Sequence, residues 1–294
     1  MNKILIVDKE KSMTSHDVVN KIRKIFKTKR VGHTGTLDPN ATGVLVVCLN
    51  EATKLVQFLE YDQKSYICRI CVGVSTSTED TDGEIVDDID MQYIEEEKID
   101  ETLKSFIGDY EQYPPMYSAV KVNGKKLYEY ARRGEFVEVK PRNVKILDIK
   151  RISKIDYDNN NIIFDFIVTV SKGTYIRTLC VDIGLKLNSP AHMKELRRIS
   201  VGNFSLVEAS KLSEIEEGKF KSFNMLEALK GYLTTEDEEL INKASHGMKV
   251  SIEKIKEVFG EKIDKFVIKK DQTLIAIYEL DISGKFYRAA RVWQ

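Results

Sequence analysis

Asp38 is the residue in this 294-residue sequence whose type and setting best suit catalysis. It lies in the segment Gly35-Thr-Leu-Asp-Pro39. Pro39 disfavours helical geometry at Asp38 and stiffens the turn, while Gly35 and Gly43 let a ligand approach the backbone closely. A carboxylate held in this way can act as a nucleophile, as a base or as a stabiliser of positive charge. An aspartate before a proline is also a common turn former, and the spacing of a phosphate-cradling P-loop is absent from this segment.

The elements that must position Asp38 are two strands and a helix. Lys3–Val7 is predicted to be a short buried strand, and the apolar run Val44–Leu49 a central one. Thr14 or Ser15 can cap a helix, with one apolar face and one basic face; the apolar face is formed by Val18, Ile22, Ile25 and Phe26. The segment between this helix and the central strand is rich in turn formers. We therefore expect it to be a loop held by a rigid scaffold, where catalytic groups are often found.

The charges are balanced overall but segregated along the chain. Lysine plus arginine number 46, as do aspartate plus glutamate. Residues 18–37 contain six basic residues and no acid, residues 121–151 contain ten basic residues and four acids, and acids concentrate between residues 79 and 101. Zero net charge argues against a protein that coats nucleic acid in general, yet this segregation favours one face that meets a polyanion. Solvated helix faces that happen to cluster are the alternative.

The cysteines and histidines favour neither a metal site nor a redox site. Cys68 and Cys71 have CxxC spacing, but they lie in a predicted strand, where residues three apart point to opposite faces. The four histidines offer no second ligand pair at zinc-like spacing. We expect no metal, and we expect the thiols to be small buried side chains.

The remaining elements interleave without a regular βαβ repeat. We expect helices at 51–61, near 98–108, at 127–133 and ending at Leu187, strands at 64–74 and 162–170, and a tight turn at Asn123-Gly124. This order favours an α/β (α+β) fold with a mixed, largely antiparallel sheet flanked by helices. Residues 1–234 are expected to form the main domain. Residues 235–294 are expected to form a small, mainly β domain, with strands near 265–269, 273–280 and a last one ending at Trp293, that leans on the larger domain.

Composition and the amino terminus bear on location. Hydrophobic residues make up 42% of the chain and charged residues 31%, which is ordinary for a soluble globular protein. No apolar run approaches the roughly 18 residues needed to span a bilayer. Only four consecutive apolar residues precede Asp8, too few for a signal peptide. A cytoplasmic protein without a membrane segment is the expectation.

Several motifs, taken in order, resemble a known family. The segment Val31-Gly-His-Thr-Gly-Thr-Leu-Asp-Pro-Asn-Ala-Thr-Gly-Val-Leu45 is similar to the catalytic motif of the TruB family of tRNA pseudouridine synthases. Lys64-Ser-Tyr66, the long segment from Tyr113 to Gly134, Ser171-Lys-Gly-Thr-Tyr-Ile-Arg-Thr178 and Leu196-Arg-Arg198 resemble later blocks of its pattern. The resemblance covers residues 3 to 205. The chain departs from it after Lys9, where the family commonly has a Pro and a Gly before Met-Thr-Ser. The end of the chain resembles the family's PUA-type RNA-binding domain only loosely.

The resemblance implies a pseudouridine synthase fold and a role for each matching residue. Asp38 is implied to be the carboxylate acting on a target uridine, whose base must leave its sugar, rotate and rejoin it through carbon. Arg177 is implied to pair with Asp38, keeping it ionised and aimed; a helix-surface cation is the alternative. Tyr66 is implied to stack on the extruded base or to take a proton from the sugar, although a strand tyrosine ordinarily serves packing.

Other residues are candidates for substrate contacts. Tyr175 and Leu196 would line the base pocket, although a core role suits Leu196 nearly as well. His33 would wedge into the RNA loop, filling the space left by the flipped base, since flipping costs a few kcal/mol that stacking contacts return. For Lys9, Lys64 and Lys121 we predict phosphate or pocket contacts; ordinary surface lysines are the alternative.

The family's substrate is the uridine at position 55 in the TΨC loop of tRNA, read through the T arm without a guide RNA. No metal, nucleotide or redox cofactor is implied, since the rearrangement is redox-neutral, and we expect a monomer. Three rival functions stay open: a non-catalytic RNA-binding or tRNA-folding protein, a guide-dependent relative working in a ribonucleoprotein, and a carboxylate-dependent hydrolase of nucleosides or sugars. Such a hydrolase would release free base instead of isomerising it.

Overall fold

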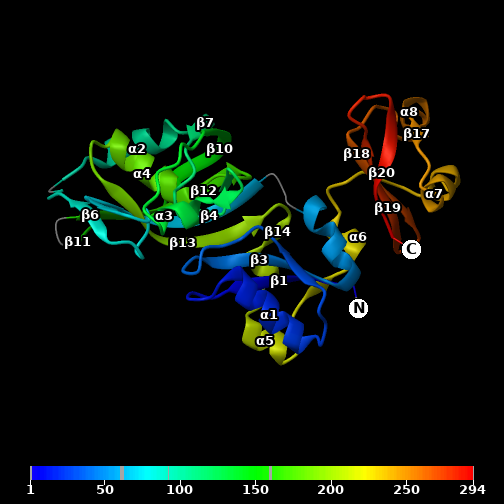
Figure 1. The fold of residues 1–294 in the computed structure, drawn as a ribbon, viewed down its shortest axis with the longest axis horizontal. Helices are drawn as coiled ribbons and strands as arrows, with labels where there is room; N and C mark the ends of the chain where they lie inside the picture. Colours follow the sequence, from blue (N-terminus) through cyan, green and yellow to red (C-terminus); the bar gives the residue numbers. More distant parts are fainter. Residues whose placement is uncertain (1, 60–62, 92, 159–160, 294) are drawn as a thin grey trace.

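Two β-sheets of unequal size organise the chain (Figure 1). The computed structural model describes residues 2–59, 63–91, 93–158 and 161–293. The larger sheet has eleven strands, and its main path runs β15-β1-β3-β13-β4-β12-β10-β7. Neighbouring strands on this path are antiparallel except β3 and β13, which pair in parallel. This confirms the predicted mixed, largely antiparallel sheet.

The amino-terminal third forms one end of the large sheet and carries the Asp38 loop between two paired strands. Thr14 caps α1 with a reciprocal capping box to Asp17, as its sequence suggested. Val31–Thr34, expected as loop, is a short strand paired with the next one. The elements are β1 (Ile4–Lys9), α1 (Ser15–Ile25), β2 (Val31–Thr34), β3 (Thr42–Leu49) and η1 (Asn50–Phe58). The helix expected at 51–61 is a 3₁₀ helix that ends at Phe58; residues 60–61 lie outside the described range.

Five further strands continue the sheet from its centre to its other edge, and two of them, β4 and β13, contribute one wall of the candidate site. They are β4 (Gln63–Val72), β7 (Gly108–Gln112), β10 (Arg142–Arg151), β12 (Asn161–Ser171) and β13 (Ala191–Val201). The sequence analysis missed β10 and β13 as strands. Smaller elements here are β5 (Val74–Thr76), β6 (Ile85–Asp88), α2 (Glu96–Lys104), β8 (Lys121–Val122), β9 (Lys125–Lys126), α3 (Leu127–Ala131), β11 (Asp156–Asp158) and α4 (Ile176–Lys186).

Helices cover opposite faces of the large sheet. Packed with α2 and α4, the apolar side chains of β4, β10, β12 and β13 form one core; those of β1 and β3 form another with α1 and α5 (Leu212–Glu216). All four cysteines are free and buried, which confirms the expected buried thiols, and burial raises the pKa of Cys48 to about 12. Cys68 and Cys71 lie in different clusters, as their strand spacing predicts. The connecting elements are β14 (Phe204–Ser205), η2 (Leu206–Glu208), β15 (Ser222–Phe223) and α6 (Met225–Ala228).

The carboxy-terminal part forms the second, five-stranded sheet with two helices. Its elements are β16 (Thr234–Thr235), α7 (Glu238–Ser245), β17 (Val250–Ser251), α8 (Ile252–Phe259), β18 (Lys265–Lys270), β19 (Thr273–Leu280) and β20 (Phe286–Val292). Val267 and Trp293 share a buried cluster with Phe58 of the larger part, and the Trp293 indole donates to the Glu51 carbonyl at 3.4 Å. The five-stranded sheet therefore packs against η1 of the larger part. Across the described residues, no helix is long and apolar enough to cross a membrane.

Candidate active site

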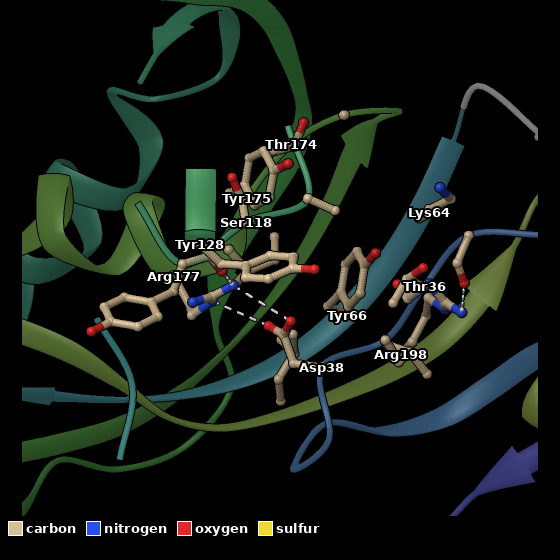
Figure 2. A pocket seen from close by; sticks show the side chains of 17 residues that line it. Thr36, Asp38, Lys64, Tyr66, Ser118, Tyr128, Thr174, Tyr175, Arg177 and Arg198 are labelled. Atoms are coloured by element: carbon tan, nitrogen blue, oxygen red, sulfur yellow. Dashed lines mark hydrogen bonds and ion pairs between the residues drawn. The ribbon is translucent and has the colours of Figure 1, made fainter. Parts of the chain in front are cut away.

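Asp38 lies at a cavity of about 400 Å³ where five separate stretches of the chain meet (Figure 2). The turn that carries it joins β2 to β3, while β4 and β13 supply one wall and the segments before α3 and α4 supply the other. The lining residues are Gly35, Thr36, Leu37, Asp38, Lys64, Tyr66, Tyr117, Ser118, Ala119, Tyr128, Gly173, Thr174, Tyr175, Ile176, Arg177, Leu196 and Arg198. A cavity of this size, which combines aromatic and apolar side chains with polar and charged groups, can hold a small ligand.

The Asp38 carboxylate forms a two-pronged ion pair with Arg177. Arg177 Nε lies 3.1 Å from Asp38 Oδ2, and its Nη2 lies 3.4 Å from Asp38 Oδ1. Arg177 is the second residue of α4 and its side chain is only 7% exposed, whereas Asp38 keeps 39% of its side-chain surface. The pair suggested by the family resemblance is therefore present, and it leaves the carboxylate open to the cavity.

Opposing effects act on the ionisation of Asp38. Burial raises the pKa of Asp38, the Arg177 guanidinium lowers it, and the Asp80 carboxylate raises it again. The net shift is upward from the ordinary value. Charge on Asp38 is thus costly in this site and depends on Arg177 staying in place.

A tight acidic hairpin between β5 and β6 completes the Arg177 environment. Arg177 Nη1 donates to the Thr78 carbonyl at 3.1 Å and lies 3.7 Å from Asp80 Oδ2. Glu79 adopts a positive φ of 64° and accepts a 3.0 Å hydrogen bond from Thr178. Burial raises the pKa of Glu79. The hairpin therefore holds the guanidinium from the side opposite Asp38.

Buried cations hold the Asp38 turn through its backbone carbonyls. Arg198, 1% exposed, donates to Gly35 O at 3.1 Å, Thr36 O at 3.4 Å and Val44 O at 2.7 Å. On the other side of the turn, Lys9 Nζ donates to Pro39 O at 2.9 Å. The residues flanking Asp38 are thereby fixed, which aims its carboxylate at the cavity.

Gly43 lets the parallel strands β3 and β13 approach at the foot of this turn. Its φ is +102°, and a Cβ there would lie 2.1 Å from the Arg198 carbonyl oxygen. No side chain fits at that distance, so glycine is required on two counts. The close approach is what brings Arg198 beneath the Asp38 turn.

Aromatic and apolar side chains form the rest of the cavity. Tyr66 comes from β4 and is 7% exposed, and Leu196 faces the cavity from β13. Tyr175 is the amino-terminal cap of α4, and Tyr117 and Tyr128 come from the segment before and within α3. Figure 2 shows the Tyr66 ring beside Asp38, with Tyr128 and Tyr175 across from it. Rings on two sides suit a planar base.

Six of the nine residues singled out from the sequence line this cavity: Asp38, Lys64, Tyr66, Tyr175, Arg177 and Leu196. The other three do not. The prediction that Lys9 contacts a phosphate or the pocket is wrong for this structure, because its amine is buried and hydrogen-bonds to three carbonyl oxygens. Burial lowers the pKa of Lys9 to about 8.

The remaining two lie outside the Asp38 cavity. His33 sits on β2, half-buried and paired with Val47 of β3, and its Nδ1 is buried without a hydrogen-bond partner in the described structure. Burial lowers the pKa of His33, which favours the neutral imidazole. Lys121 is exposed on β8 and borders a separate hollow formed with residues 137–142. Neither residue contacts Asp38.

Sequence reasoning missed several residues of the site. Arg198 stands in the quoted Leu196-Arg-Arg198 block, and Tyr117 and Tyr128 stand in the quoted 113–134 segment, so the resemblance could have drawn attention to them. Asp80 stands in an acidic stretch that we had treated only as a charge pattern. Among the described residues, no group of three or more His, Cys, Asp or Glu side chains could hold a metal ion.

Comparison with known proteins agrees with the resemblance. Residues 23–176 match the family model "TruB family pseudouridylate synthase (N terminal domain)", and residues 177–240 match "tRNA pseudouridylate synthase B C-terminal domain". The chain is 51% identical over 218 residues to tRNA pseudouridine synthase B of Bacillus pumilus, covering 74% of this chain and 71% of that one. The protein of the same name from Staphylococcus aureus strain Newman is 50% identical over 218 residues, covering 74% and 72%.

Solved structures share the fold at lower identity. The Cbf5-Nop10-Gar1 complex matches with a TM-score of 0.71 and 24% identity over 99% of this chain and 84% of that one. An H/ACA RNP bound to a substrate RNA containing 2'-deoxyuridine matches with a TM-score of 0.69 and 22% identity, over 99% and 85%. These two support the pseudouridine synthase fold. With family models matching 23–240 and half-identical relatives over most of the chain, the protein belongs to the TruB family of pseudouridylate synthases.

Proposed function

We propose that this protein isomerises uridine to pseudouridine in tRNA, with Asp38 as the catalytic carboxylate. The observation that carries the proposal is the Asp38–Arg177 pair, 3.1 Å apart, at a cavity lined by tyrosine rings in a TruB-family chain. The relatives at 50–51% identity are named tRNA pseudouridine synthase B, which supports tRNA as the substrate.

The substrate we propose is the uridine at position 55 in the TΨC loop, recognised through the T arm without a guide RNA. An extruded base suits the cavity, because a planar ring can stack between aromatic side chains and repay the cost of flipping. We further propose a cytoplasmic monomer that uses no metal or organic cofactor.

In this mechanism Asp38 acts on the sugar or base once the nucleotide is flipped into the cavity. Arg177 keeps the carboxylate ionised despite burial, since its charge opposes the upward shift of the Asp38 pKa. Tyr66 stacks on the base or takes a proton from the sugar, Tyr175 lines the base pocket, and Leu196 supplies an apolar floor that excludes water. Attack at the sugar, stabilisation of charge at the anomeric carbon and base catalysis all fit the position of Asp38.

The proposal gives the surrounding basic residues RNA-binding roles. Lys64 lines the cavity and is assigned to the phosphate of the flipped nucleotide, and Lys121, exposed on β8, to the phosphates beside it. His33 is assigned to the space that the flipped base vacates. The segment 235–294 is assigned to a PUA-like domain that binds RNA, so its removal should weaken tRNA binding more than it slows the bound reaction.

The test is a single-turnover incubation of the purified protein with an unmodified T-arm stem-loop, with pseudouridine mapped by carbodiimide modification. Wild type should convert the loop uridine. Asp38→Asn should lower the rate by roughly three orders of magnitude or more while RNA affinity stays within a few-fold. Near-normal turnover by Asp38→Asn would overturn the assignment of the carboxylate. Tight binding by wild type without product would favour an RNA-folding protein instead.

A further inference from the structure

Gln112 is a buried polar residue just behind the cavity that the proposed mechanism does not use. It is the last residue of β7, the edge strand of the large sheet, and is 1% exposed. It does not line the cavity. A buried amide carries two donor hydrogens and an acceptor that must all be accounted for.

The Gln112 amide pairs with both backbone groups of one residue, Tyr175. Gln112 Oε1 accepts from Tyr175 N at 2.7 Å, and Gln112 Nε2 donates to Tyr175 O at 2.9 Å. The side chain thus imitates a neighbouring β-strand at a single residue, 63 positions away in the sequence. Tyr175 caps α4 in extended geometry, and no side chain of its own segment caps that helix. Gln112 therefore restrains the backbone of the cap residue from another element.

A third hydrogen bond, to Tyr110, fixes which way the Gln112 amide points. Gln112 Nε2 lies 3.4 Å from Tyr110 Oη, and the Tyr110 hydroxyl donates to the Asp182 carboxylate. Because that hydroxyl uses its hydrogen on Asp182, its oxygen must accept from Gln112. The nitrogen of the amide is therefore on the side of Tyr110 and the Tyr175 carbonyl, and the oxygen is left for the Tyr175 N–H. Only a side chain with a donor and an acceptor in this order satisfies all three partners.

The residues restrained by Gln112 belong both to the aromatic lining of the cavity and to the Asp38–Arg177 ion pair. Tyr175 places its ring in the cavity, and Arg177 follows two residues later in the first turn of α4. Beyond Gln112, the chain continues through residues 113–116 to Tyr117, whose carbonyl accepts from Arg177 Nη2 at 3.1 Å. One buried amide thus joins the start of α4 to the segment that leads into α3, and these two stretches form the same wall of the cavity.

We propose that Gln112 is a positioning residue for the isomerisation: its amide clamps the Tyr175 backbone and thereby sets both the Tyr175 ring and the Arg177 guanidinium against Asp38. This inference rests on the proposed function, because its consequence is a rate. Gln112 touches neither the substrate nor the reacting atoms.

The test compares three variants with wild type in the single-turnover tRNA assay. Gln112→Met keeps the side-chain length and removes all three hydrogen bonds, two to the Tyr175 backbone and one to Tyr110. Gln112→Glu keeps the acceptor and replaces the donor facing the Tyr175 carbonyl. The control Gln57→Glu makes the same chemical change at an exposed glutamine of η1. Each variant is measured for single-turnover rate, tRNA Kd, thermal midpoint and pH profile of the rate.

The clamp predicts that Gln112→Met lowers the single-turnover rate roughly ten- to a hundredfold, as a misplacement of about 1 Å does, while the tRNA Kd changes less than about threefold. It also predicts that the acidic limb of the rate–pH profile moves to higher pH, because a displaced Arg177 no longer lowers the Asp38 pKa. A merely structural role would lower the thermal midpoint without moving that limb. Gln57→Glu should match wild type.

An unchanged rate or an unmoved acidic limb in Gln112→Met would overturn the inference. If Gln112→Met does not fold, Tyr110→Phe replaces it, since that change leaves Gln112 in place and removes the hydroxyl that orients its amide, together with the hydrogen bond to Asp182. The same shift of the acidic limb, smaller in size, is then expected, and its absence overturns the clamp. Failure of the proposed function is a separate result, because wild type itself would then make no pseudouridine.

Discussion

The two walls of the Asp38 cavity are built in different ways. The wall that carries Asp38 stands between paired strands, is held by the buried side chains of Arg198 and Lys9, and rests on apolar clusters on both faces of the sheet. The facing wall consists of the start of α4 and of residues 113–141, and this second stretch contains only the two-residue strands β8 and β9 and the short helix α3.

The facing wall is held mainly by local, exposed contacts. Lys126 and Arg132 lie over the Tyr128 ring, 5.4 and 5.2 Å from its centroid, and Phe136 is 95% exposed. A segment with few buried contacts opens at low free-energy cost. The comparison teaches that the carboxylate is pre-organised by a fixed wall, while the facing wall is the one that can yield when, as we propose, a flipped nucleotide enters the cavity.

The largest difference in stability between the two walls is expected at two glycines with positive φ, one on each wall. Gly43→Ala should cost roughly 3–5 kcal/mol of unfolding free energy, because its Cβ would meet the Arg198 backbone at 2.1 Å and force β3 from β13. Gly124→Ala on the facing wall has φ +82° and open space around it, so it should cost only about 1–2 kcal/mol. Urea melts of both variants measure this. Equal losses would mean that the walls are not differently fixed.

Arg177 contacts both walls, so a change there probes how they act together. Arg177→Lys keeps the charge but loses the fork that reaches Asp38, Thr78 and Tyr117. We expect the single-turnover rate to fall roughly ten- to a hundredfold, with an acidic limb at higher pH because the Asp38 pKa rises when its partner is displaced. Rate–pH profiles check this, with Lys145→Arg, an exposed conservative change on β10, as the control. A full rate at neutral pH would show that charge without geometry suffices.

The pH dependence of the unfolding free energy tests the fixed wall by itself, because Lys9 belongs to that wall alone. Burial lowers the pKa of Lys9 from its ordinary 10.5 to about 8. Between these values the unfolded chain binds more protons at this residue than the folded one, so wild-type stability should rise with pH across this window relative to Lys9→Met. Urea melts at pH 7.5, 8.5 and 9.5 measure the difference between the two proteins. A difference that stays constant or falls with pH would contradict the burial of a charged amine here.

The smallest effect is expected from two lysines of the facing wall, the exposed Lys125 and the half-buried Lys126. Lys125→Ala and Lys126→Ala should each weaken tRNA binding a few-fold and reduce the salt slope of binding by about 1 where a phosphate contact is lost. The single-turnover rate at saturation should stay at the wild-type value, because neither residue supports Asp38. Filter binding at several salt concentrations checks this. The control is Lys219→Ala, at an exposed lysine that follows α5 in the chain. A rate loss at saturation would show that this wall also shapes the reaction.

The sequence predicted well the features that depend on residues close together in the chain. The Asp38 turn, the Thr14 cap and the last strand, predicted to end at Trp293 and found as β20 ending at Val292, follow from turn chemistry, capping and alternation, each readable within about ten residues. The resemblance added Arg177 as the partner of Asp38. The long strand β13 was missed because its mixture of apolar and basic residues follows neither a clean alternation nor an apolar run.

The sequence was a poor guide to contacts made on backbone atoms. Arg198 and Lys9 both bind carbonyl oxygens of the Asp38 turn, and Gln112 binds the backbone of Tyr175. Every residue offers a carbonyl, so such partners leave no trace in the residue types. Lys9 therefore looked like a surface cation, although only the fold decides that its amine is enclosed.

The parallel pairing of β3 with β13 also bears on how the protein is made. Thr42 and Gly43 pair with Arg197 and Arg198, so the Asp38 turn receives its support from a strand about 150 residues later in synthesis. Until β13 has emerged from the ribosome, the nascent chain carries its carboxylate in an unsupported loop beside open strand edges. Such distant pairings fold slowly, so the last step in assembling the sheet is also the step that creates the cavity. A growing chain therefore has no finished site with which to engage RNA before its large domain is complete.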